Sequence, residues 1–170
     1  MRIAPRIPIL LALLAASAVP AAEQPAEPEY SFRTEGHVRL RSGPIDVSWE
    51  SIPFNRTYSE LTQEQKARFK TLYVGMPESD EPPYPAGGLK ALYEPIGQGQ
   101  AALRASGVVE MEIVVGADGE PAEVLVMRSP SSAVTKFVGS VAMLTKFKPA
   151  ICSGQPCRGS FPLRVQLRMR

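Results

Sequence analysis

Two stretches in the second half of the chain alternate apolar and polar residues and are joined by a turn signal. "GVVEMEIVV" (107–115) places apolar side chains along one face, and "AEVLV" (122–126) continues the alternation after Asp118-Gly119. A period of two is typical of a β-strand with one buried face, and Asp-Gly is a strong hairpin signal. The sequence therefore predicts a β-hairpin with one face in the core.

A helix and a third strand are predicted after this hairpin. Behind Ser131 or Ser132 as N-cap, apolar residues recur at the spacing of an amphipathic helix: Val134, Phe137, Val138, Val141 and Leu144. The segment "SFPLRVQLRMR" (160–170) then alternates again. Its apolar face holds Phe161, Leu163, Val165, Leu167 and Met169, and its polar face holds Arg164, Gln166, Arg168 and Arg170.

This order of elements predicts an α+β fold. We expect a three-stranded sheet with β-β-α-β connectivity and spatial order 2-1-3, with one helix packed on a face. The crossover is right-handed when the second and third strands are parallel and the first lies between them. The C-terminal strand is then an edge strand whose outer N–H and C=O groups lack partners. Its arginines either guard this edge against self-association or select an acidic partner strand.

The preceding segment, residues 36–83, predicts a small α/β appendage without a core of its own. "HVRLRSGPIDVSWE" (37–50) alternates around a Gly-Pro turn and predicts a hairpin. Thr62 and Gln65 form a capping-box pattern for a helix that ends near Gly75.

Two further segments lie on either side of the predicted boundary at residue 84. "PESDEPPYPAGG" (77–88) has the composition of an acidic, Pro-rich linker. Residues 89–106 predict one or two short helices, interrupted at Pro95-Ile96-Gly97. The second domain is expected to run from residue 84 to residue 170.

The N-terminus has the pattern of a secretory signal. Arg2 and Arg6 precede an apolar stretch of about 13 residues, and small residues follow it. As a helix this stretch would span about 20 Å, short of the roughly 30 Å of a hydrocarbon core. We therefore expect residues 1–22 to be a signal peptide, residues 23–35 a disordered lead and the mature protein exported. The alternative is a retained segment that anchors the chain in a membrane.

The charge is divided unevenly along the chain. All 17 acidic residues precede Arg128, whereas eight lysines and arginines and no acidic residue lie between Arg128 and Arg170. A basic surface can indicate nucleic acid, but export and the lack of an aromatic-rich nucleic-acid motif argue against that partner. Solvated arginines on an exposed sheet face, or an acidic protein or envelope partner, are the two interpretations that remain.

Cys152 and Cys157 are the only cysteines, and in an exported chain they are most simply a disulfide. A zinc site needs about four ligands, and the only further soft ligand is the remote His37. Gly154 and Pro156 indicate a turn rather than the Cys-x-x-Cys of a redox centre. The sequence offers no catalytic triad or phosphate-binding loop, so we expect neither an enzyme nor a bound metal or cofactor.

The second half of the chain resembles the C-terminal domain of TonB-family energy transducers. The matching pieces, in order, are Tyr84-Pro85, the hairpin, the helix, "KFKPA" with Pro149, "GQP" and the alternating final strand. The resemblance covers residues 84–170 and implies a periplasmic domain that binds outer-membrane receptors by adding their extended segment to the sheet edge.

By position, this resemblance implies that the edge strand Phe161–Met169 binds the partner. The residues concerned are Phe161, Leu163, Arg164, Val165, Gln166, Leu167, Arg168 and Met169. The partner would be an outer-membrane receptor or another envelope protein, and a homodimer through the same edge is a further expectation. Contact with the membrane is expected only if the signal segment is retained, which would anchor the chain in the inner membrane facing the periplasm.

The chain also departs from the family pattern. A transducer needs an uncleaved membrane helix and a long Pro-rich spacer, and this chain has a signal that looks cleavable and only short Pro-containing stretches. The cysteine pair lies where the family has an ordinary turn, where a disulfide would fix the start of the last strand. An envelope structural or inhibitory protein that uses the same fold without a transport role is therefore the alternative.

Overall fold

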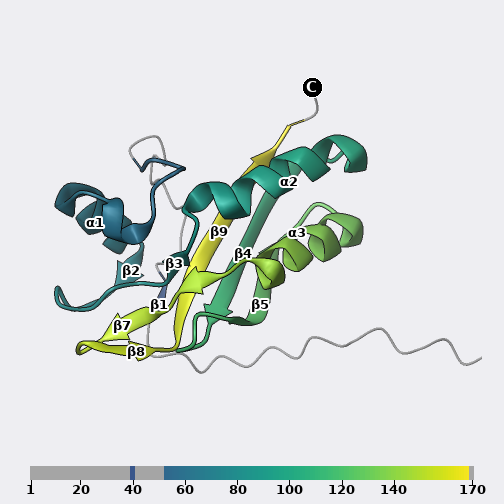
Figure 1. Cartoon of the computed structure of the whole chain (residues 1–170). Helices are drawn as coiled ribbons and strands as arrows, with labels where there is room; N and C mark the ends of the chain where they lie inside the picture. The colour runs from purple at the N-terminus through teal and green to yellow at the C-terminus, as the bar shows by residue number, and fades with distance from the viewer. Residues whose placement is uncertain (1–38, 41–51, 169–170) are drawn as a thin grey trace, which may run out of the picture. The chain divides into compact units, whose positions relative to one another are not determined.

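The computed structural model describes residues 39, 40 and 52–168, and within them a three-stranded antiparallel sheet is the central element. β4 (Gly107–Val115) lies in the middle, with β5 (Pro121–Arg128) on one side and β9 (Gly159–Leu167) on the other. Figure 1 shows this order, β5-β4-β9. It is the predicted 2-1-3 arrangement, and Gly119 takes the left-handed conformation that the hairpin turn requires, with φ 82°.

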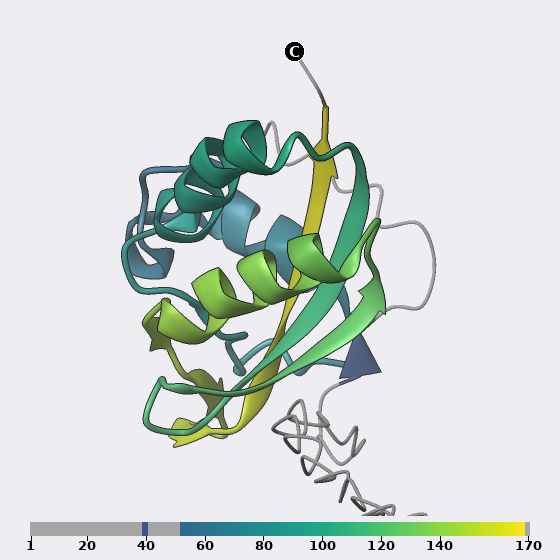
Figure 2. The same cartoon turned by 90° about the vertical axis from the view of Figure 1, so that its right-hand side faces the viewer.

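Two helices cover one face of this sheet (Figure 2). α3 (Ser132–Leu144) is the predicted crossover helix, and the Ser131 hydroxyl caps it by accepting a hydrogen bond from the Val134 amide at 3.3 Å. α2 (Leu89–Leu103) is one continuous helix, so the predicted break at Pro95 is wrong. Pro95 removes one N–H from the helical ladder and its ring crowds the carbonyl one turn earlier, but the buried Leu92 and Ile96 on either side hold the helix against the core.

The core lies between the sheet and these helices. Val109, Met111, Ile113 and Val115 of β4 are all buried, as the period-two pattern predicted. The same core contains Phe161, Leu163 and Leu167 of β9 and Leu89, Leu92, Ile96, Val134, Val138 and Ala142 of the helices.

Residues 52–83, expected as an appendage without a core of its own, contribute to this same core. They form a 3-10 helix (Tyr58–Glu60), α1 (Gln63–Lys70) and β2 (Tyr73–Val74), which pairs with β1 (Arg39–Leu40). Their buried side chains are Ile52, Tyr58, Leu61, Phe69, Leu72 and Tyr73. The predicted capping box of Thr62 and Gln65 is present, but the helix ends at Lys70 and Gly75 instead follows β2.

The segment 77–88, which its composition indicated as a linker, is held by backbone hydrogen bonds. Glu81 and Ile151 exchange both N–H···O=C bonds, at 2.9 and 2.8 Å. β3 (Tyr84–Pro85) pairs with β6 (Phe147–Lys148). Proline and acidic composition predicts irregular backbone but cannot exclude such tertiary pairing.

A small disulfide-linked hairpin precedes β9. β7 (Ala150–Cys152) and β8 (Gln155–Cys157) pair antiparallel, and Cys152 and Cys157 are bonded as predicted. The predictions for the signal peptide, the disordered lead, most of the first hairpin, His37 and Met169 concern residues outside the described part of the chain. Within the part that is described, no helix is both long enough and apolar enough to span a membrane.

Candidate protein-binding interface

β9 is the strand in which the sequence placed the candidate partner-binding residues. It pairs with β4 over its whole length, from Gly159 opposite Val115 to Leu167 opposite Gly107. No other described strand pairs with its far side, so β9 is an edge strand of this sheet.

The predicted binding residues of β9 divide between the two faces of the sheet. Phe161, Leu163 and Leu167 are buried in the core, and Val165 is half-buried against it. These four side chains therefore stabilise the fold, and their contacts are already made within the chain. The side chains turned away from the core are those of Arg164, Gln166 and Arg168, of which Gln166 and Arg168 are exposed.

Arg164 forms an ion pair on this outer face. Its Nε lies 3.2 Å from an Oε of Glu110, the residue directly opposite it on β4, and both side chains are about one-third exposed. Cross-strand pairs of opposite charge stabilise a sheet by a fraction of a kcal/mol to about 1 kcal/mol. Arg164 is thus a partly neutralised group, whereas the sequence alone indicated a solvated one.

The backbone on the outer edge of β9 contacts side chains from residues 73–100 of the same chain. The Tyr73 hydroxyl donates a buried hydrogen bond to the Ser160 carbonyl at 3.0 Å. Gln100 Nε2 donates to the Arg168 carbonyl. Pro162 lies between these two contacts and has no N–H to offer a partner.

These contacts come from elements whose role at the edge the sequence did not predict. Tyr73 was expected within the helix predicted to end near Gly75, and Gln100 had no assigned role. Burial raises the pKa of Tyr73 and of Tyr93 well above the ordinary value; the Arg164 backbone opposes this effect at Tyr93. Both phenols therefore stay protonated at neutral pH, and Tyr73 remains a hydrogen-bond donor.

The disulfide hairpin lies immediately before β9. The Cα atoms of Cys152 and Cys157 are 5.8 Å apart, and Ser153 and Gly154 between them have positive φ values of 50° and 80°. The Ser153 amide donates to the Asp80 carboxylate at 2.9 Å, which connects the hairpin turn to the segment before β3. The arrangement fixes the chain entering β9.

Tyr84, Pro85 and Pro149, the residues that carry the family resemblance, lie around β3 and β6. Tyr84 is fully buried, and its ring packs edge-on against Phe69 and Phe161, with centroids 5.3 and 6.4 Å away. Burial raises the pKa of its hydroxyl, which has no hydrogen-bond partner among the described residues. Pro149 separates β6 from β7. Tyr84 and Pro85 are therefore packed in the core beside β9.

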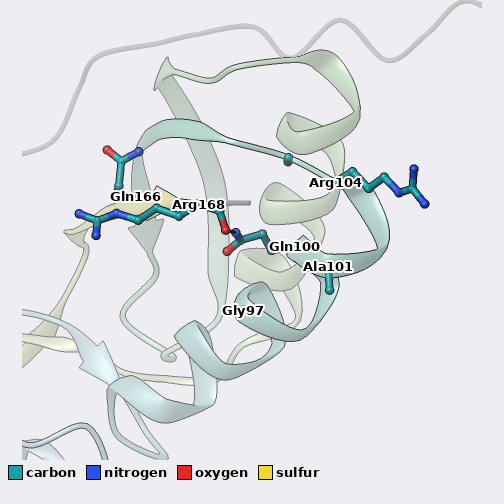
Figure 3. Close-up of a pocket in the computed structure, with 7 residues that line it drawn as sticks. Gly97, Gln100, Ala101, Arg104, Gln166 and Arg168 are labelled. Atoms are coloured by element: carbon teal, nitrogen blue, oxygen red, sulfur yellow. Dashed lines mark hydrogen bonds between the residues drawn. The ribbon is translucent and has the colours of Figure 1, made fainter. Parts of the chain in front are cut away.

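A groove of about 830 Å³ lies where α2 ends beside the end of β9. Its lining includes Gln100, Arg104, Gln166 and Arg168. In Figure 3 the Arg104 and Arg168 side chains point in opposite directions, so their charges do not converge on one ligand. The groove therefore has no geometry for a small anion, and in the described part of the chain no cluster of side chains could hold a metal.

β5 forms the opposite edge of the sheet, and the residues along this edge are mostly apolar. No described strand pairs with that side. Val124, Leu125 and Val126 are half-buried, and the Met127 side chain that follows is 71% exposed.

No protein-family model matches the chain, and no curated protein sequence matches it.

Proposed function

We propose that this chain is an exported, periplasmic protein-binding domain that engages a partner by β-strand addition at β9, in the manner implied by its resemblance to TonB C-terminal domains. The observation that carries the proposal is that β9 is a nine-residue edge strand that pairs on one side only among the described strands. Strand addition supplies affinity through backbone hydrogen bonds and selectivity through side chains at alternate positions.

The buried side chains of β9 leave specific parts of the strand for the partner. Phe161, Leu163 and Leu167 already fill the core. Recognition would therefore depend on the outer backbone of the strand and on Arg164, Gln166 and Arg168. Their charge favours an acidic partner segment, because Gln166 and Arg168 are exposed and the described part of the chain after Met127 has no acidic residue.

A partner strand on β9 has to replace the contacts that Tyr73 and Gln100 make with its backbone. Breaking a buried hydrogen bond costs about 1–3 kcal/mol when one group loses its partner, but an incoming strand supplies a new one. We therefore propose that these side chains cover the β9 edge until a partner displaces them.

Site-specific photo-crosslinking in the native envelope tests this function. A photo-reactive residue at Gln166 is expected to capture a protein that the same residue at Glu64, an exposed position on α1, does not capture. Mass spectrometry of the adduct should locate the crosslink in an extended acidic segment of the partner. Identical adducts at the two positions, or none, would contradict binding at β9.

A double variant of the side chains that contact the β9 backbone makes the test sharper. Tyr73→Phe combined with Gln100→Ala removes two hydrogen bonds to the β9 backbone and should raise the crosslinking yield from position 166. If the yield stays unchanged while the Gln166 adduct persists, the partner binds without displacing these side chains.

The second candidate is an envelope structural or inhibitory protein whose functional surface lies in residues 36–83. It is favoured by the fact that the chain's own side chains contact the β9 edge, and by two exposed apolar residues, Phe54 and Val74. Deletion of this region would remove core residues such as Phe69, so point probes are needed instead. Photo-reactive residues at Phe54 and Val74 that capture a partner, with none captured at Gln166, would favour this candidate.

Export itself is tested by the intact mass of the protein recovered from the native envelope. Loss of about 22 residues is expected under the signal-peptide pattern, and a full-length mass would support the membrane-anchored alternative. The same measurement before and after reduction reports the state of the Cys152–Cys157 bond.

A further inference from the structure

The open edge strand β5 has a sequence that is complementary to itself. Neighbouring residues of a strand direct their backbone groups to opposite sides. In β9 the backbone groups of Ser160 and Arg164 point to the outer side of the strand. Followed through the register of β4, the same alternation directs the backbone groups of Val124 and Val126 to the outer side of β5. An added strand would therefore hydrogen-bond to Val124 and Val126.

This edge lacks the protection that β9 has. Among the described strands none pairs with its outer side, and its four consecutive apolar residues run from Val124 to Met127. A long apolar edge strand left open is a site of association. Met127 is the extra residue of a β-bulge, since Val126 lies opposite Met111 and Arg128 opposite Glu110.

The bulge places Arg128 on the same face of the sheet as Glu123. Glu123 pairs with Val114 and Leu125 pairs with Glu112, and these side chains point away from the core. Arg128 pairs with Glu110 on that same outer face. Arg128 therefore takes the outer-face position that Met127 would occupy in a regular strand. Among the described residues it has no acidic partner within ion-pair distance.

We propose that a second copy of this chain pairs with β5, antiparallel and with a two-fold axis at Leu125. In this register Leu125 faces its own equivalent, and Val124 faces Val126 of the other copy in hydrogen-bonded pairs. Glu123 of each copy, which forms an ion pair with Arg158 of its own chain at 3.6 Å, lies opposite Arg128 of the other, so Arg128 gains an acidic neighbour. The two sheets become one continuous six-stranded sheet, and β5 ceases to be an edge.

The helix beside this edge leaves room for the second copy. Phe137 of α3 contacts Gly99 of α2, and Gly139, two residues on, lies on the opposite flank of the helix. Among the described residues no atom lies within 4 Å of the position that a Cβ at Gly139 would occupy, so they leave this flank open. A second α3 can therefore approach across the two-fold axis.

A cysteine at the two-fold axis tests the register directly. Leu125 would lie in a non-hydrogen-bonded pair with itself, where Cα atoms are about 4.5 Å apart, within disulfide reach. We expect Leu125→Cys to form an interchain disulfide under mild oxidation. Gln166→Cys is the matched control, because it would crosslink only if the chain dimerised through β9.

The charge pair is tested by sedimentation equilibrium of the mature chain. Wild type should show a concentration-dependent monomer–dimer equilibrium, and Arg128→Glu should raise the dimer dissociation constant about tenfold or more, because each Glu123 would then face a like charge. Arg56→Glu, an equal charge change at an exposed residue just before the 3-10 helix, should leave the constant nearly unchanged. Circular dichroism checks that each variant folds.

Three results would overturn the proposal: a monomer at every concentration, an interchain disulfide at position 166 but not at 125, or equal effects of the two charge variants. The binding function proposed at β9 is assessed separately, because its probe is at Gln166 and does not require a dimer.

Discussion

The Tyr73 hydroxyl donates a buried hydrogen bond to the Ser160 carbonyl across 87 residues of sequence, at 3.0 Å. The bond joins β2, a short strand of the N-terminal region, to the beginning of β9, the strand to which the sequence assigned partner binding. One side chain thus links the fold of residues 52–83 to the accessibility of the β9 edge.

Tyr73→Phe should lower the free energy of unfolding by about 1–3 kcal/mol, because the phenylalanine keeps the ring but leaves the buried Ser160 carbonyl without this donor. Urea denaturation followed by circular dichroism measures the change. Val74→Ala is the control: Val74 is the next residue and is 53% exposed, so its loss should cost no more than about 0.5 kcal/mol. Equal losses in the two variants would show that the hydrogen bond contributes little.

The main sheet and its helix could be predicted because their patterns are local. The hairpin of β4 and β5 needs only a period of two around Asp118-Gly119, and α3 needs only a helical period behind Ser131. Each pattern is complete within about 20 residues, and the burial of one face follows from it directly.

The covering of β9 could not be predicted, because it depends on contacts between distant segments. The sequence placed Tyr73 in a predicted helix, and nothing near it indicates that its hydroxyl reaches Ser160. Gln100 is likewise an ordinary polar residue of a helix until α2 is placed beside Arg168. An edge strand can be recognised from connectivity, whereas its protection by side chains depends on tertiary structure.

Two glycines of α2 form a matched pair that tests helix packing. Gly97→Ala should stabilise the protein by about 0.5–1 kcal/mol, because no atom of the described residues lies within 4 Å of the added Cβ and alanine is the better helix former. Gly99→Ala should instead destabilise it by about 1–2 kcal/mol, because its Cβ would clash with the Phe137 ring of α3. Thermal and urea denaturation measure both. If both variants are more stable than the wild type, α2 and α3 pack less closely than described.

Reduction of the Cys152–Cys157 bond should cost about 2 kcal/mol, since the bond closes a short loop and removes little chain entropy from the unfolded state. The double variant Cys152→Ser, Cys157→Ser should show the same loss with or without reductant. A structural disulfide also predicts no catalysed reduction of insulin by the protein. Turnover in that assay, absent in the double serine variant, would assign the pair a redox role.

Alkaline pH should destabilise the protein through its buried tyrosines. Burial raises the pKa of Tyr58, Tyr73, Tyr84 and Tyr93 above 10.0, the ordinary value that applies in the unfolded chain. The stabilisation is complete below pH 10 and is lost as the pH rises, because the unfolded chain then releases protons that the native chain retains. Each fully retained proton lowers the free energy of unfolding by about 1.4 kcal/mol per pH unit above 10.

Urea midpoints at pH values of about 9, 10 and 11, together with the ultraviolet absorbance of the phenolate, measure this dependence. Burial lowers the pKa of Lys148, partly offset by Glu81, so this lysine acts in the opposite direction as the pH rises. Comparison with Tyr73→Phe isolates one tyrosine, because Lys148 is common to both proteins. The variant should lose stability less steeply above pH 10 than the wild type. Parallel slopes would mean that Tyr73 ionises in the native state as readily as in the unfolded chain.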